Sequence, residues 1–168
     1  MKHALMRHTL IALMEDKPGV LSRVSSLFRR RNYNIESLSV GHSETPGISR
    51  MTIVVRGDDQ IVDQVTKQLC KLVNVTQVLI VGTQPTVVRE LALIKVKAVG
   101  GSRTEVMQLA SVFRARVVSV SKNSLMVEIT GPEDRVNSLI GLLEPFGIQE
   151  IARTGRVAMV RSDNGYAV

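Results

Sequence analysis

The chain has 168 residues, enough for one ordinary domain or for two small ones. Its hydrophobic content of 44% comes from aliphatic side chains, because aromatic residues make up only 3%, and this excludes a haem pocket or a surface on which bases stack. The net charge is +7, and the basic residues are scattered along the chain. The single cysteine, Cys70, excludes a disulfide framework and a cysteine-based metal site.

The first half of the chain predicts two helices among four strands. Val20, Val24 and Leu27 recur at the spacing of a helix face, whereas Met51 and Ile53 alternate as in a strand. In chain order, the predicted elements are a strand at 9–14, a helix at 18–31, strands at 35–42 and 50–56, a helix that opens at 57–59, and a strand at 75–81. The resulting order is βαββαβ.

A short segment rich in turn residues, 83–87, separates this half from a second one in which the same order repeats. The predicted elements there are a strand at 91–98, a helix at 102–113, strands at 115–120 and 125–130, a helix that opens at 131–133, and strands at 148–153 and 157–160. Each half has the length of a ferredoxin-like sandwich, an antiparallel four-stranded sheet with two helices on one face. The predicted fold class is therefore α+β, with two tandem ferredoxin-like domains at 1–82 and 88–168.

The turn between the first strand and the first helix, residues 15–22, is the strongest candidate for a binding site. Pro18 fits the first position of a helix, which makes Lys17 the expected N-cap, and lysine offers no oxygen to accept the first N–H groups. The N–H groups of residues 19–21 are then open to a carboxylate, and Asp16 could hold an ammonium group. The alternative is that Asp16 folds back and caps its own helix.

The corresponding turn of the second half has a different pattern. Ser102 and Glu105 have the spacing of a capping box, in which the two side chains satisfy N–H groups at the helix start. The sequence therefore predicts a small-ligand site in the first half only.

An enzymatic function finds no support in the side chains. His3, His8 and His42 lack the spacing of metal ligands, the sequence has no glycine-rich phosphate loop, and no serine or cysteine stands in the context of a known nucleophile. We therefore expect no catalytic residue and no metal site.

Two other binding functions are disfavoured as well. Sheets of this topology that bind RNA carry aromatic residues on their central strands, where this chain has Met51, Ile53 and Val55. A transcription regulator would need a helix-turn-helix segment, for which the two sandwiches leave no room. No stretch approaches the length of a membrane span, and residues 1–7 show no export signal, so we expect a cytoplasmic protein without a nucleic-acid or membrane partner.

Several segments of the chain resemble one protein family. They are EDKPGVLSRV at 15–24, RNYNIESL at 31–38, SRMTI at 49–53, QLCKLV at 68–73 and RELALIKV at 89–96. The first half is similar to an ACT domain, a βαββαβ module that binds amino acids between paired copies. Nearly the whole chain is similar to the small regulatory subunit of acetolactate synthase (acetohydroxyacid synthase).

The resemblance implies a regulatory role without chemistry of its own. Members of this family associate with a catalytic subunit that uses thiamine diphosphate and magnesium, raise its activity, and transmit feedback inhibition by valine or a related branched-chain amino acid. The alternative is an ACT-type regulator of another enzyme or of transcription. The amino-acid effector is then the only small molecule expected on this chain.

The resemblance also implies where the effector binds, at the interface of two ACT domains in a homodimer. The implied site residues are Asp16, Gly19, Val20 and Leu21 from one domain, and Asn34 and Ile35 from its neighbour. Many relatives have asparagine at the position of Asp16. The aspartate is expected to alter affinity or effector preference, since a charged acceptor binds an ammonium group more strongly.

Overall fold

The structure, a computed structural model, describes residues 6–82 and 84–161. Some predictions concern positions outside these residues: the start of the first domain and the export signal considered at 1–5, His3, the linker at residue 83, and the end of the second domain at 162–168.

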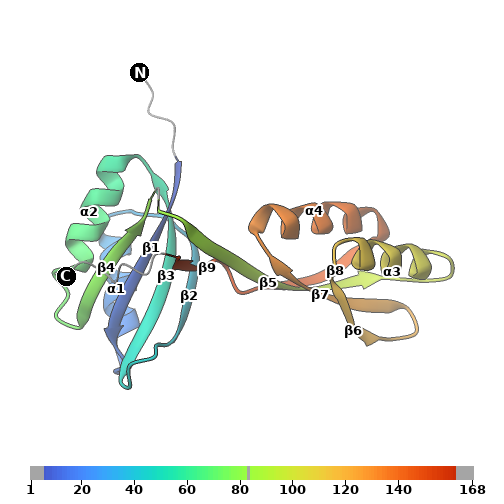
Figure 1. Cartoon of the computed structure of the whole chain (residues 1–168), viewed down its shortest axis with the longest axis horizontal. Coiled ribbons are helices and arrows are strands. Elements are labelled where there is room, and N and C mark those ends of the chain that lie inside the picture. The colour runs from blue at the N-terminus through green and yellow to red at the C-terminus, as the bar shows by residue number, and fades with distance from the viewer. Residues whose placement is uncertain (1–5, 83, 162–168) are drawn as a thin grey trace. The chain divides into compact units, whose positions relative to one another are not determined.

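The described chain separates into two compact units (Figure 1). Val88–Gly155 forms the second unit, and the first unit contains the chain up to Val87 together with the described residues from Arg156 onward. The expected second domain at 88–168 therefore differs from the division in the structure, because the chain returns to the first unit after Gly155.

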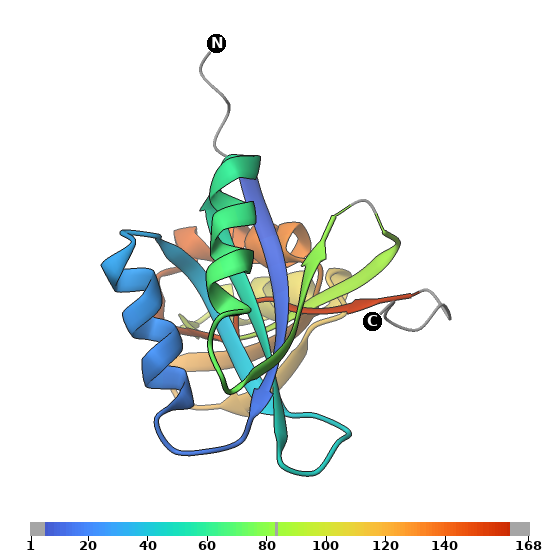
Figure 2. The ribbon, with the colours of Figure 1, turned by 90° about the vertical axis from the view of Figure 1, so that its left-hand side faces the viewer.

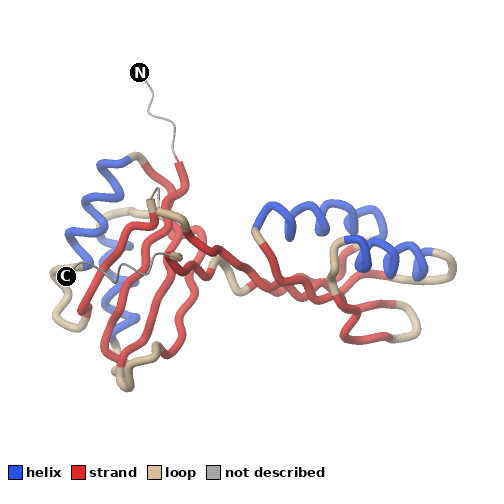
Figure 3. The backbone as a smooth tube through the Cα atoms, in the orientation of Figure 1, coloured by secondary structure: helices blue, strands red, loops and turns tan. Residues whose placement is uncertain are grey.

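The first unit is an α+β sandwich, as predicted. Its elements are β1 (Met6–Glu15), α1 (Val20–Arg30), β2 (Ile35–His42), β3 (Ile48–Gly57), α2 (Asp59–Leu69) and β4 (Val75–Val81). The strands form an antiparallel sheet in the order β2-β3-β1-β4, so β2 and β4 are its edges. Both helices cover one face of this sheet (Figures 2 and 3).

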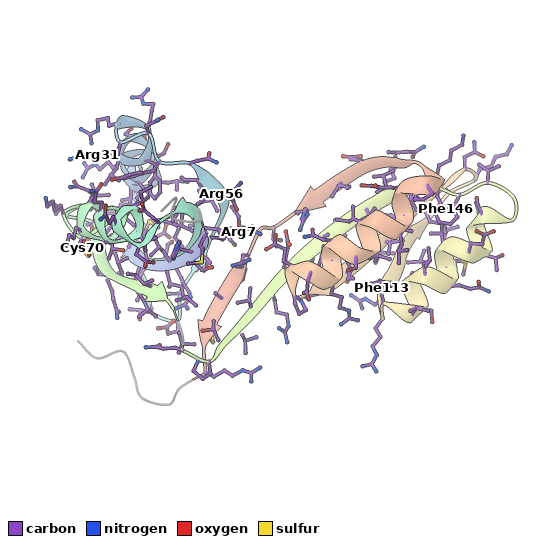
Figure 4. The ribbon with its side chains drawn as sticks, turned by 90° about the horizontal axis from the view of Figure 1, so that it is seen from above. Arg7, Arg31, Arg56, Cys70, Phe113 and Phe146 are labelled. Atoms are coloured by element: carbon purple, nitrogen blue, oxygen red, sulfur yellow. The ribbon has the colours of Figure 1, made fainter. Side chains whose placement is uncertain are left out.

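The core of the first unit lies between the sheet and these helices. Alternate residues of the two central strands point into it, among them Leu10 on β1 and Ile53 on β3, and both are fully buried. The helices add residues at the predicted spacing, including Val24 from α1 and Leu69 from α2. Arg31 follows α1 at its exposed end (Figure 4). Burial of each such aliphatic side chain is worth about 1.5–3 kcal/mol and fixes α1 against β1.

The end of the described chain covers the other face of the first sheet. Residues 156–161, which we call the strap, include β9 (Val157–Val160), and this strand pairs with β5 (Thr86–Lys97). Ala158 is 1% exposed, and its carbonyl accepts a hydrogen bond of 3.0 Å from Nη2 of Arg50 on β3. Val54, whose side chain points away from the helices, is also fully buried. The strap is therefore an integral part of the first unit.

The second unit repeats the fold. Its elements are β5 (Thr86–Lys97), α3 (Ser102–Val112), β6 (Arg116–Val120), β7 (Ser124–Gly131), α4 (Glu133–Leu143), the 3₁₀ turn η1 (Glu144–Phe146) and β8 (Ile148–Arg153). The antiparallel order is β6-β7-β5-β8. Phe113 and Phe146 pack against its core (Figure 4). β5 begins at Thr86 rather than at residue 91, so part of the predicted linker is strand. No helix in the described part of the chain is long and apolar enough to span a membrane.

Candidate functional site

The turn between β1 and α1 has a glycine at the helix start. Gly19 is the N-cap, with a left-handed backbone (φ 85°, ψ −9°), and α1 begins at Val20. The prediction that Lys17 caps a helix starting at Pro18 is therefore wrong. The turn needs a positive φ immediately before the helix, and glycine adopts it without steric cost. A Cβ atom at Gly19 would find no atom within 4 Å, so the space in front of this residue is open.

Two of the first N–H groups of α1 are available to a ligand. The N–H of Val20 donates to the carbonyl of Lys17 at 3.3 Å, so it is not open as predicted. No side chain caps the helix, and within the described residues no acceptor faces the N–H groups of Leu21 and Ser22. Unpaired amides at the positive end of a helix favour a carboxylate.

Asp16 lies beside this turn and does not cap the helix, which decides against the alternative considered above. Its N–H donates to the carbonyl of Gly47 at 2.8 Å. Its carboxylate Oδ2 lies 3.2 Å from Nδ1 of His42, at the end of β2. The Asp16 side chain is 47% exposed, so it keeps accessible oxygen surface for a ligand's ammonium group.

A polar cluster that the sequence analysis missed supports the turn. The carboxylate of Glu15 accepts a hydrogen bond of 2.5 Å from Nδ2 of Asn74 and pairs with Nζ of Lys17 at 3.1 Å. These two partners, Asn74 first, hold the pKa of Glu15 below its ordinary value. Arg23 on α1 donates to Oδ1 of Asn74 at 2.8 Å. Antiparallel pairing of β1 with β4 explains the position of Asn74. It sets the end of β1, where Glu15 lies, beside the start of β4, which Asn74 precedes.

The remaining predicted site residues differ in how much surface they offer. Asn34 is exposed directly before β2, and Ile35 is half-buried against the first core. Val20 is only 4% exposed and belongs to that core, whereas Leu21 is 46% exposed beside the open amides. Leu21 and Ile35 therefore retain apolar surface for a ligand, and Val20 serves packing.

One chain does not bring the two groups of predicted residues together. Asp16 contacts His42 at the end of β2, while Ile35 begins that strand. The strand has 8 residues, so at about 3.3 Å per residue the groups are separated by roughly 20 Å. A single amino acid cannot bridge that distance.

The corresponding turn of the second unit has a different local structure from the predicted one. Gly101 is the N-cap of α3, and no side chain among the described residues caps this helix. The hydroxyl of Ser102 instead donates to the carbonyl of Val99 at 2.8 Å and accepts from the N–H of Val99 at 3.0 Å. The predicted capping box with Glu105 is wrong, because Ser102 already lies in the first helical turn and its hydroxyl bonds to the preceding loop.

Comparison with known proteins identifies the family. A family model described as the small subunit of acetolactate synthase matches residues 89–162, and one described as an AHAS small subunit-like ACT domain matches residues 10–77. The chain is 53% identical over 158 residues to the probable acetolactate synthase small subunit of Archaeoglobus fulgidus, across 94% of this chain and 99% of that protein. The chain belongs to the acetolactate synthase small-subunit family.

Other members of this family agree over the same length. The acetolactate synthase small subunit of Mycobacterium bovis is 52% identical over 158 residues, which is 94% of each chain. The crystal structure of the acetolactate synthase small subunit from Thermotoga maritima has a TM-score of 0.88 and 43% identity, and the match covers 95% of this chain and 99% of that one. The fold of the family is therefore the fold described here.

Family membership confirms the coarse functional prediction. The chain is an acetolactate synthase small subunit, a non-catalytic regulatory subunit of a thiamine-diphosphate-dependent enzyme of branched-chain amino acid biosynthesis. A small subunit implies a large, catalytic one as its partner, and the ACT domain points to an amino acid as effector. The described residues include no group of three or more His, Cys, Asp or Glu side chains that could hold a metal ion.

Proposed function

We propose that two copies of this acetolactate synthase small subunit form effector sites for a branched-chain amino acid, with valine as the first candidate. Binding at these sites inhibits the catalytic subunit, which this chain otherwise activates. The observation that carries the proposal is the separation of the two groups of predicted site residues at opposite ends of β2, which favours a site shared between two copies.

Pairing of two first units along β2 would complete the sites. Within the described part of the chain, β2 is an edge strand whose one strand neighbour is β3. If two β2 edges pair antiparallel about a two-fold axis, the start of one strand lies beside the end of the other. Asn34 and Ile35 of one copy then come close to Asp16 and Gly19 of its partner.

The exposed side chains of β2 fit such an interface. Leu38 and Val40 are 36% and 44% exposed, and they stand opposite the core residues Ile53 and Met51 of β3. Their apolar surface continues the first core to the edge of the sheet, where a second copy would cover it.

The chemistry of the composite site matches an α-amino acid. The open N–H groups of Leu21 and Ser22 would bind the carboxylate, and the carboxylate of Asp16 would bind the ammonium group. Ile35 of the neighbouring copy and Leu21 offer apolar surface for a small aliphatic side chain, and Asn34 offers a polar amide.

The test compares two substitutions of Gly19 in the holoenzyme reconstituted with its catalytic subunit. Gly19→Asp places a negative charge where the ligand's carboxylate would lie, and Gly19→Asn has the same shape and the same backbone strain without the charge. We expect Gly19→Asp to abolish inhibition by valine, and Gly19→Asn to retain most of it. Activation should survive in both variants.

Calorimetric titration of the purified chain with valine, leucine, isoleucine and glutamate gives the binding side of the same test. Heat that appears with branched-chain ligands and disappears in Gly19→Asp supports the site. Full inhibition of the Gly19→Asp holoenzyme would refute it.

A further inference from the structure

The strap makes hydrogen bonds to three strands of the first sheet. The backbone N–H of Arg156 donates to Oγ of Ser37 on β2 at 3.0 Å, and its Nη1 donates to Oγ1 of Thr9 on β1 at 2.9 Å. Arg50 on β3 donates to the carbonyl of Ala158 at 3.0 Å. These bonds fix the strap where it begins, on the face of the sheet that carries no helix.

Ser37 lies next to the proposed effector site along β2. The pairing of β2 with β3 changes register between Ile35 and Ser37, which leaves Glu36 as the extra residue. The carboxylate of Glu36 pairs with Nε of Arg7 on β1 at 2.5 Å. Three consecutive residues of β2 therefore have three different roles. Ile35 belongs to the proposed effector site, Glu36 contacts β1, and Ser37 contacts the strap.

The contact at Ser37 also marks the place where the chain returns from the second unit. Gly155 is the last residue of that unit, and its φ of 75° turns the chain. Arg156 follows at once, and its N–H is held by the hydroxyl of Ser37 rather than by a backbone carbonyl. A partly buried N–H that loses its acceptor is unfavourable, so the position of Ser37 determines where the returning chain can lie.

We propose that the hydrogen bond between Arg156 and Ser37 transmits occupancy of the effector site to the strap, which follows directly after the last residue of the second unit. The proposal rests on the proposed function and deepens it. A ligand held by Asn34 and Ile35 selects one arrangement of the irregular start of β2. Ser37 moves with that start, and the first residue of the strap follows it. Ser37 is thus a positioning residue that acts through Arg156.

A pair of serines on one face of β2 provides the experiment. Ser37→Ala removes the hydroxyl that accepts the hydrogen bond from the N–H of Arg156. Ser39→Ala makes the same change two residues later on β2, where the side chain has no hydrogen bond among the described residues. Thr9→Val removes the second contact of Arg156 and keeps the side-chain volume. Each variant is reconstituted with the catalytic subunit, and activation is measured without valine, followed by inhibition over a valine titration.

For Ser37→Ala we expect activation and the affinity of the isolated chain for valine to stay within twofold of the native values. The valine concentration for half-maximal inhibition should rise about fivefold or more, the change that loss of one coupling hydrogen bond produces. Thr9→Val should shift it in the same direction, and Ser39→Ala should leave it unchanged.

Two results would overturn the coupling role. One is inhibition of Ser37→Ala at the same valine concentrations as Ser39→Ala. The other is a parallel loss of activation, valine binding and thermal stability in Ser37→Ala, which would make the contact structural only. Failure of the proposed function has a different signature, because the native holoenzyme itself would then be insensitive to valine, leucine and isoleucine.

Discussion

The carboxylate of Asp16 and the imidazole of His42 meet where β1 ends and β2 ends, with 3.2 Å between Oδ2 and Nδ1. The two residues are far apart in sequence. Because β1 and β2 both pair antiparallel with β3, they finish at the same end of the sheet, and this brings the two residues together. The His42 side chain is 84% exposed, so the contact orients Asp16 and contributes little to stability. Asp16 is thereby held beside the open amides of α1.

Asp16→Asn should weaken valine binding about fivefold, because a neutral amide replaces a charged acceptor for the ligand's ammonium group. Calorimetry on the purified chain measures the change. The matched control is Asp63→Asn, which neutralises an exposed carboxylate paired with Lys67 on α2 and should leave the affinity as it is. Equal affinities for native protein and Asp16→Asn would remove Asp16 from the site.

Val40→Lys should convert the proposed dimer into monomers, since it places a charge on the exposed apolar surface of the β2 edge. Sedimentation velocity reports the change, and valine binding should be lost with it because each proposed site is formed by two copies. The matched control is Val120→Lys. It makes the same substitution on β6, the corresponding edge strand of the second unit, where the valine side chain is 62% exposed. A Val40→Lys variant that remains dimeric would exclude β2 pairing.

Arg114→Gly should stabilise the second unit by about 0.5–1 kcal/mol, because Arg114 follows α3 with φ 51°, a left-handed conformation that costs a residue with a Cβ more than it costs glycine. Urea unfolding measures the shift. Asn32 follows α1 in the same conformation, with φ 55°. Asparagine tolerates this region better than arginine, so Asn32→Gly should gain less. A lower unfolding midpoint for Arg114→Gly would contradict the assignment of strain.

Asn74→Ala should raise the pKa of Glu15 toward its ordinary value of 4.5, because the hydrogen bond from Asn74 is the largest cause of the lowered pKa. The native carboxylate binds its proton less readily than the unfolded one does. Its contribution to stability is therefore complete above pH 4.5 and disappears as the pH falls through the lowered pKa. An NMR titration of Glu15 in both proteins tests this, and identical curves would show that Asn74 is not the cause.

Much of the fold could be predicted from hydrophobic period alone. Val24 and Leu27 fall on one helix face, Met51 and Ile53 on one strand face, and all four are buried in the first core. The period determines such positions because the core accepts only the apolar face of each element. The strap was predicted only as a further strand of the second domain, since four residues such as Val157–Val160 carry no signal for which sheet they join.

The sequence indicated candidate residues for the site but not their geometry. The glycine and proline around residue 19 indicated a special turn, yet the position of the N-cap depended on the φ of Gly19, which the order of residues leaves open. His42 and Asn74 could not be assigned to the turn from local sequence. They reach it through strand pairing over long separations in the chain.

The sequence by itself determined the two βαββαβ units, their apolar faces and the family, because these depend on periodicity and on the order of residues along the chain. The tertiary structure decided which amides of α1 are open, that the two groups of predicted site residues lie at opposite ends of β2, and that the strap returns to the first sheet. Those features depend on backbone dihedral angles and on pairing between distant segments, which are settled only when the whole unit packs.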